Sequence, residues 1–267
     1  MKNFNDFKSK IEFVLTDIDD TLTTDGELRA QAYDSLWKLH NAGLKIIPIT
    51  GRPAGWCEMI ARFWPVDGVV GENGGFYFRY TALPNNKNKK MKRWFAFSED
   101  EIKKNQHKLQ QIQNQILTQV PEAAISSDQF CRLMDLAVDF CEDIPRLNPQ
   151  QISQIVDLFH QQGAQAKISS IHVNGWFGDY NKVSTALIYL KNEHKLTLDE
   201  CLDKSVFIGD SPNDEPMFEK FPHSVGVANI KKFATQLQSK PAYVTDSEGG
   251  QGFSEFANHL LKKRETP

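Results

Sequence analysis

The sequence predicts an α/β fold in which a parallel sheet alternates with helices and is interrupted by a smaller α+β unit. Strand-like and helix-like segments alternate in residues 12–74 and again after residue 181. Between residues 84 and 177 the order of segments changes. The length of 267 residues suits one large domain or two modest ones. Together these observations indicate one core built from both ends of the chain, with an insert between them.

In the first third, short apolar stretches alternate with helical ones. The expected elements are a strand at residues 12–17, a helix at 27–43, a strand at 44–51, a helix at 54–64 and a strand with a turn at 67–74. Pro48 lies inside the second strand, and we expect it near the strand's end or at a distortion because proline cannot donate to a ladder. This β-α-β-α-β order predicts parallel strands with right-handed crossovers.

The middle of the chain indicates a compact unit of its own. Residues 74–84 and 92–97 are typical of edge or hairpin strands, and Ser98 with Glu101 forms an S-x-x-E capping box before a long helix. The other expected elements are a strand at 130–140, a helix that starts at Asn148 and Pro149, and one strand at 166–178. We therefore expect an α+β insert at residues 84–177, and a core formed by residues 1–83 and 178–267.

The alternation resumes in the last third. The expected elements are helices at residues 182–194, 213–221, 230–239 and 252–264, with strands at 205–210, 223–228 and 242–245. These strands complete the parallel sheet that the first third begins. The simplest architecture is therefore one α/β core interrupted by the insert, and no internal repeat is visible.

Composition narrows the class of protein. Hydrophobic residues make up 40% and charged residues 24%, and the net charge is −3, which does not favour nucleic acid or an anionic membrane as a partner. The basic run at residues 85–93 is local, and we expect a solvated loop there. The four cysteines are widely spaced and form no C-x-x-C pair, which fits reduced thiols. With no apolar signal core and no membrane-length apolar window, we expect a cytoplasmic protein.

Acidic residues follow two of the expected strands. Asp17 lies at the carboxyl end of the first strand, with Asp19 two residues on, and Asp210 and Asp214 follow the apolar strand at 206–208. The carboxyl ends of parallel strands meet at one edge, where open α/β sheets bind ligands. Convergent carboxylates without a visible basic partner predict a divalent cation, and oxygen ligands favour Mg²⁺ over zinc.

The acidic residues have two other interpretations. An EF-hand loop starting at Asp17 would need glycine at its sixth position and glutamate at its twelfth, but these positions hold Leu22 and Leu28. Aspartates also cap helices and form turns. That role explains one or two of the residues, such as Asp20, but not two strand ends built in the same way.

Further residues suit a phosphate group. Thr50 and Gly51 lie at another strand end, where a hydroxyl and backbone N–H groups can hold phosphate oxygens. Lys182 begins a helix after the insert and could neutralise the same group. The stretch GENGG at residues 71–75 lacks the G-x-G-x-x-G spacing, so we interpret it as a turn, with Asn73 as a rim contact.

In this order, the motifs resemble those of the haloacid dehalogenase (HAD) superfamily of phosphotransferases. The first motif, D-x-D-x-T, is Asp17–Thr21, the second contains Thr50, the third is Lys182, and the fourth, G-D-x-x-x-D, is Gly209–Asp214. The resemblance implies a Rossmann-like core. The insert is similar to the type-2 cap found in Cof-like phosphatases and sucrose-phosphate phosphatase. Ser211 departs from the frequent Gly-Asp-Gly form of the fourth motif.

The resemblance also implies roles for two carboxylates in phosphoryl transfer. Asp17 would be the nucleophile that forms an aspartyl-phosphate. Asp19 would be the general acid for the leaving oxygen and then the base for the attacking water. Mg²⁺ would be the cofactor, held by Asp17, by the backbone carbonyl of Asp19 and by Asp210, with Asp214 in support.

Other residues would bind the transferring phosphoryl group. The resemblance assigns this role to Thr50 and Lys182, with Asn213 as a weaker candidate. Substrate choice would lie on the cap. Residues 174–182, Arg52 and Trp56 are candidates for it, although a packed turn explains the first of these equally well.

The favoured function is therefore a Mg²⁺-dependent phosphatase acting on a small phosphorylated metabolite, with a sugar phosphate as the preferred class. A phosphomutase that uses the same aspartyl-phosphate is the alternative. A binding module with a spent active site is a third hypothesis, disfavoured because every motif residue is present. The expected protein is a monomer or a small homo-oligomer without nucleic-acid or membrane partners.

Overall fold

The central sheet is parallel, as the alternation of segments predicts. The structure, a computed structural model, describes residues 2–3, 11–82, 88–169 and 171–265. The sheet orders its described strands as β1-β13-β12-β11-β2-β3, and all neighbours are parallel. The strands are β1 (Lys2–Asn3), β2 (Phe13–Thr16), β3 (Lys45–Pro48), β11 (Ser205–Gly209), β12 (Ser224–Gly226) and β13 (Tyr243–Val244). Pro48 is the last residue of β3, as expected. At this position its missing N–H does not interrupt the hydrogen bonds inside the strand.

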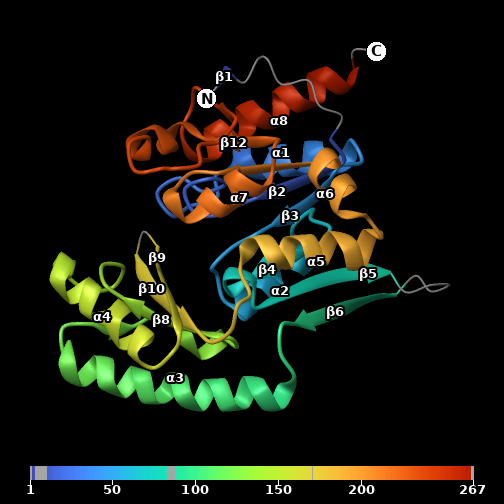
Figure 1. The fold of residues 1–267 in the computed structure, drawn as a ribbon. Helices are drawn as coiled ribbons and strands as arrows, with labels where there is room; N and C mark the ends of the chain where they lie inside the picture. Colours follow the sequence, from blue (N-terminus) through green and yellow to red (C-terminus); the bar gives the residue numbers. More distant parts are fainter. Residues whose placement is uncertain (1, 4–10, 83–87, 170, 266–267) are drawn as a thin grey trace.

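Helices cover both faces of this sheet (Figure 1). They are α1 (Ala30–Asn41), α2 (Ala54–Phe63), α5 (Lys182–His194), α6 (Leu198–Lys204), α7 (Glu215–Lys220) and α8 (Gly249–Glu265). Strand alternation divides the core: Val14 packs in the cluster that includes residues of α1 and α8, whereas Phe13 and Leu15 pack in the cluster with α5 and α7. Burying each such side chain stabilises the fold by about 1.5–3 kcal/mol.

A second, antiparallel sheet extends the core. It is formed by β4 (Val69–Gly71), β5 (Phe76–Ala82) and β6 (Lys89–Phe95), and an isolated bridge from Ile49 to Val70 connects it to the end of β3. Part of the basic run predicted as a loop is therefore strand β6, where Met91 is buried. Residues 85–87 of that run lie outside the described residues.

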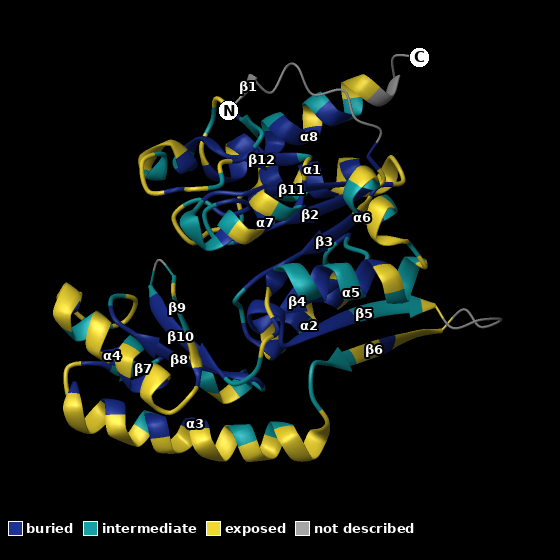
Figure 2. Ribbon diagram, viewed as in Figure 1, coloured by how far each residue is buried: buried dark blue, intermediate teal, exposed yellow. Residues whose placement is uncertain are grey.

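The insert has its own sheet and its own core. The sheet orders β7 (Ala124–Ile125), β8 (Asp135–Asp139), β10 (His172–Trp176) and β9 (Gln165–Ile168), and the helices α3 (Glu99–Gln119) and α4 (Pro149–Gln161) pack on it. Figure 2 shows these two helices exposed on their outer sides, while the strands are largely buried. Because β6 pairs with β5 of the core, we propose that the insert begins near residue 97, later than the expected boundary at residue 84.

The structure corrects two of the expected elements and adds a helix that was not expected. Residues 166–178 form two antiparallel strands, β9 and β10, where one strand was expected. Residues 230–239 do not form an α-helix: a 3-10 segment at Ala228–Phe233 replaces it. Helix α6 was not expected, although its capping box, Thr197 with Glu200, is visible in the sequence. The capping boxes at Ser98 and Asn148 are both formed.

Hydropathy adds one finding. Among the described residues, none of the helices is both long enough and apolar enough to cross a membrane.

Candidate active site

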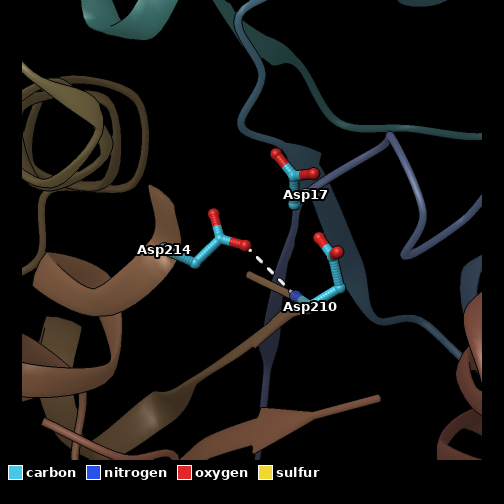
Figure 3. A group of neighbouring side chains, drawn as sticks. All are labelled: Asp17, Asp210 and Asp214. Carbon is cyan, nitrogen blue, oxygen red and sulfur yellow. Dashed lines mark hydrogen bonds between the residues drawn. The ribbon is translucent and has the colours of Figure 1, made fainter. Parts of the chain in front are cut away.

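Three carboxylates meet where two neighbouring strands end. Strand β2 pairs with β11, so that the chain leaves both strands at the same edge of the sheet, and the N–H of Asp17 donates to the carbonyl of Ile208 at 2.9 Å. Asp17, Asp210 and Asp214 each place one carboxylate oxygen within 4.8 Å of the others, and all three residues are buried (Figure 3). The predicted convergence of the first and fourth motifs is therefore what the fold produces.

The turn after β11 positions Asp214. A 3-10 segment at Pro212–Asp214 brings its carboxylate back, and Oδ2 accepts a hydrogen bond from the N–H of Asp210 at 3.2 Å. A Cβ atom at Gly209 would lie 2.5 Å from the same oxygen, so any side chain there would displace Asp214. Thr21 donates to Oδ1 of Asp210 at 3.3 Å, which links the two motifs directly.

Lys182 is the basic partner of this acidic group. It is the first residue of α5, behind the Asn181 capping box, and its side chain is buried. Its Nζ lies 2.7 Å from Oδ1 of Asp17 and 2.9 Å from Oδ1 of Asp214. The ammonium thus contacts two of the three carboxylates, and the group as a whole carries an excess of negative charge when the carboxylates are ionised.

Burial shapes the protonation of this group. It raises the pKa of Asp17 to about 8; Lys182 opposes the shift, and the carboxylates of Asp214 and Asp19 add to it. Burial also raises the pKa of Asp210 well above its usual range, and Asp214 adds to that shift. For Lys182, burial lowers the pKa, but Asp17 and Asp214 outweigh burial and raise it. A divalent cation would favour the ionised carboxylates, and the oxygen-only donor set fits Mg²⁺.

Asp19 faces a different partner. The Nε of Arg52 lies 3.1 Å from both of its carboxylate oxygens, and Nη2 lies 2.7 Å from Oδ1. The guanidinium carbon of Arg52 lies 4.4 Å from the ring centre of Trp56. The carboxylate of Asp19 is thus outside the group of three, and a contribution of its backbone carbonyl to a metal site stays a prediction. Asp20 serves a turn at φ 55°, and its N–H donates to Thr23 at 2.9 Å.

Thr50 and Gly51 follow strand β3 and lie next to Arg52, the partner of Asp19. Thr50 is buried, and its hydroxyl accepts the N–H of Arg52 at 3.0 Å, so the hydroxyl proton can be donated to a ligand. Asn73 donates its N–H to the carbonyl of Thr50 at 3.1 Å, and its side chain lies against Gly51. Both Gly51 and Asn73 line the cavity.

Asn213 contacts Lys167, a residue that the motifs did not indicate. Its side-chain Oδ1 is buried without a hydrogen-bond partner among the described residues. Its backbone carbonyl accepts a hydrogen bond from Nζ of Lys167, a residue of the cap strand β9, at 2.8 Å. In the sequence, Lys167 looks like any solvated lysine of a strand, so no local signal could have identified it.

The GENGG turn joins the core to the cap. The buried carboxylate of Glu72 accepts hydrogen bonds from the backbone N–H groups of Ala54, Leu133, Met134 and Asp135. Glu72 and Asn73 have positive φ angles of 44° and 55°. The guanidinium of Arg132 contacts Asp128, Asp135 and the carbonyl of Gly51. Sequence reasoning identified the turn but missed this junction, whose partners lie far along the chain.

Core and cap enclose one large cavity of about 1050 Å³. The core contributes the carboxylates Asp17, Asp19 and Asp210 to its lining. From the cap, His172 and Asn174 reach it along one face of β10. A ligand bound to the carboxylates would therefore extend toward polar groups of the cap.

The comparisons with known proteins agree with this architecture. A family model for haloacid dehalogenase-like hydrolases matches residues 14–135, a segment that includes Asp17, Asp19 and Thr50. A search of curated proteins finds no match. The predicted resemblance to this superfamily is thus confirmed by a family match that spans the first two motifs.

Solved structures resemble the chain over nearly its whole length. Thermoplasma acidophilum 0175 has a TM-score of 0.67 and 20% identity, covering 94% of this chain and 98% of that chain. The sucrose-phosphatase from Synechocystis sp. PCC6803, solved with sucrose and phosphate, has a TM-score of 0.63 and 17% identity, with coverages of 95% and 98%. The HAD subclass IIB sugar phosphatase BT4131 has a TM-score of 0.60 and 14% identity, with coverages of 94% and 99%.

At these identities the structural likeness shows the fold. The chain has the HAD fold, with a parallel core sheet and an inserted α+β unit. The family match, over residues 14–135, indicates that this part of the chain is similar to HAD-like hydrolases.

Proposed function

We propose that the protein is a Mg²⁺-dependent phosphatase that hydrolyses a small phosphorylated metabolite through an aspartyl-phosphate at Asp17. The observation that carries this proposal is the buried group of Asp17, Asp210 and Asp214 around the ammonium of Lys182. It offers a nucleophile, an oxygen-rich cation site and a fixed positive charge within a few ångströms. Phosphoryl transfer depends mainly on such positioning and charge neutralisation.

The reaction divides into two steps. In the first, a carboxylate oxygen of Asp17 attacks phosphorus, the bond to the leaving oxygen breaks, and Asp19 gives its proton to that oxygen. In the second, Asp19 takes a proton from water as the water oxygen attacks phosphorus, which releases phosphate and restores Asp17. Asp19 suits this exchange because it lines the same cavity as Asp17.

The cation would be held by side-chain oxygens of Asp17, Asp210 and Asp214 and by the backbone carbonyl of Asp19. When bound, it neutralises the charge that builds up on the phosphoryl oxygens. Lys182 adds its own ammonium there, and Thr50 donates its hydroxyl proton to a phosphoryl oxygen. The backbone N–H of Gly51 and the side chain of Asn213 are the further phosphate-binding candidates.

A sugar phosphate is the substrate class we favour. The cavity of about 1050 Å³ has room for a leaving group larger than the phosphate itself. His172 and Asn174 offer hydrogen-bonding groups on its cap side. The sugar phosphatases of the same fold support this choice.

The test is a panel of metabolite phosphates assayed with Mg²⁺ and with a chelator. We expect phosphate release that the chelator abolishes and that Asp17→Asn lowers at least about 10³-fold, as loss of a nucleophile does. Asp25→Asn, at an exposed turn, is the matched control and keeps full activity. An isomerised sugar phosphate without free phosphate would instead show a mutase, and an unchanged rate in Asp17→Asn would contradict the proposal.

A further inference from the structure

A lysine of the inserted domain, which we call the cap, contacts the loop of the fourth motif. Strand β9 lies at the end of the cap that approaches the core near α7 (Figure 1). From this strand, Nζ of Lys167 donates to the carbonyl of Asn213 at 2.8 Å. Asn213 directly precedes Asp214, so a cation of the cap lies beside the acidic group of the core.

Lys167 and Lys182 act on each other across the two domains. Burial lowers the pKa of Lys167 to about 8, and the ammonium of Lys182 adds to this effect, whereas Asp214 and Asp17 oppose it. The same two carboxylates are the partners of Lys182. Lys167 of the cap therefore lies near enough to Lys182 of the core for their charges to repel, and the residue that it contacts directly precedes Asp214.

Hydrogen-bonding capacity points in the same direction. An ammonium group has three N–H donors, and the Asn213 carbonyl uses one donor of Lys167. A dianion placed between two ammonium groups would relieve their repulsion and accept further hydrogen bonds. A phosphoryl group has both the charge and the oxygens for this.

We propose that Lys167 is a cap-borne phosphate-binding residue that donates to an oxygen of the phosphoryl group held at Asp17 and Lys182. This inference rests on the proposed phosphoryl site. Both domains would then supply residues of the phosphate site. Closure of the cap on the core would complete that site as well as enclose the leaving group. The contact with Asn213 holds the ammonium beside the residue that precedes Asp214.

The competing role for Lys167 is a purely structural clasp between β9 and the Asn213 carbonyl. A clasp affects the stability of the closed arrangement but leaves the affinity for inorganic phosphate nearly unchanged. Lys167→Met removes the charge and keeps most of the apolar stem. Lys167→Arg keeps the charge, and Lys108→Met on the outer helix α3 is the matched control.

The experiment measures binding of inorganic phosphate to the full chain with Mg²⁺ by calorimetry, with kcat and KM for the best substrate measured in parallel. We expect Lys167→Met to weaken phosphate binding at least about tenfold, Lys167→Arg to stay within about fivefold, and Lys108→Met to match the wild type. Thermal unfolding confirms that each variant is folded.

The outcomes separate this inference from the proposed function. Phosphate affinity within about twofold of wild type in Lys167→Met overturns the inference, even if the enzyme is an active phosphatase. A wild-type protein that binds no phosphate overturns it too. A wild-type protein that hydrolyses no phosphoester but loses phosphate affinity in Lys167→Met contradicts only the proposed function, because calorimetry needs no turnover.

Discussion

Two buried groups of carboxylates lie close together in this protein, and their partners differ. At the core–cap junction, Glu72 accepts four backbone N–H groups, and Arg132 pairs with both Asp128 and Asp135. At the strand ends, the ammonium of Lys182 contacts Asp17 and Asp214, and the carboxylate of Asp210 lies beside these two. Each group has three carboxylates, but in the first one backbone N–H groups satisfy Glu72 while a guanidinium pairs with the two aspartates. In the second group, the ammonium of Lys182 contacts Asp17 and Asp214 but not Asp210, which leaves carboxylate oxygens available to a cation.

The difference teaches that a shifted pKa does not by itself mark a catalytic group. Burial raises the pKa of Glu72 to about 8, with Asp135 adding to the shift, and burial raises that of Asp17 to about 8 as well. Only the partners distinguish them. Carboxylates that the chain leaves under-compensated are the better candidates for function.

The largest expected effect comes from Lys182→Met. The change removes the ammonium beside Asp17, so we expect kcat/KM to fall at least about 10³-fold, the size reported for loss of such charged groups in phosphoryl transfer. Unfolding in a chelator should be easier than in wild type, and Mg²⁺ should restore part of the lost stability. Thermal unfolding with and without Mg²⁺ checks this. If Mg²⁺ did not raise the unfolding temperature of Lys182→Met, the proposed difference between the two groups of carboxylates would be wrong.

Arg132→Met should damage stability more than chemistry. It leaves Asp128 and Asp135 without their guanidinium, and breaking a buried pair costs about 3–5 kcal/mol of unfolding free energy. Denaturant unfolding measures this loss of stability. Mg²⁺ should stabilise Arg132→Met no more than it stabilises the wild type. The exposed Arg29→Met, whose partner Asp25 is in solvent, is the control with little effect. A loss rescued by Mg²⁺ would show that the two groups are not distinct.

Glu72 gives a pH dependence with a definite sign. Its folded-state pKa of about 8 lies above the unfolded value of 4.5, so its stabilising contribution is complete below the unfolded pKa and is lost as pH rises through 8. Relative to Glu72→Gln, the unfolding free energy of wild type should fall by up to about 4 kcal/mol between pH 5 and 8. Denaturant unfolding at both pH values tests this. If the unfolding free energy changed equally with pH in wild type and Glu72→Gln, Glu72 would be ionised at both pH values.

A smaller effect is expected from Gly209→Ala. The new Cβ atom would meet Oδ2 of Asp214 at 2.5 Å and displace that carboxylate from the acidic group. We expect Mg²⁺ affinity to fall about tenfold, equivalent to about 1.4 kcal/mol. Gly43→Gln is the control, because no atom lies within 4 Å of a Cβ atom added at Gly43. This variant should leave the Mg²⁺ affinity unchanged.

The sequence predicted the parts of the site that follow strand ends. Asp17 and Asp210 could be placed at one edge because parallel strands end together, and Lys182 because it begins a helix in the right order of motifs. Glu72, Arg132 and Lys167 could not be found in this way. Each acts through a partner distant in sequence, and a single side chain carries no signal of such a contact.

The misassigned elements have similar causes. The turn between β9 and β10 contains Ser169 rather than glycine or proline, so the hairpin looked like one strand. The expected helix at residues 230–239 is replaced because Asn229 bonds both to Asp20 and to Gly249, which fixes the local backbone from outside. Tertiary contacts outweighed local propensity in these places.

The most direct test of the central claim is a calorimetric titration of the metal-free protein with Mg²⁺. We expect one Mg²⁺ to bind per chain, with an affinity at least about tenfold weaker in Asp210→Asn and unchanged in Glu72→Gln. A wild-type protein that binds no Mg²⁺, or whose affinity depends on Glu72 and not on Asp210, would contradict it.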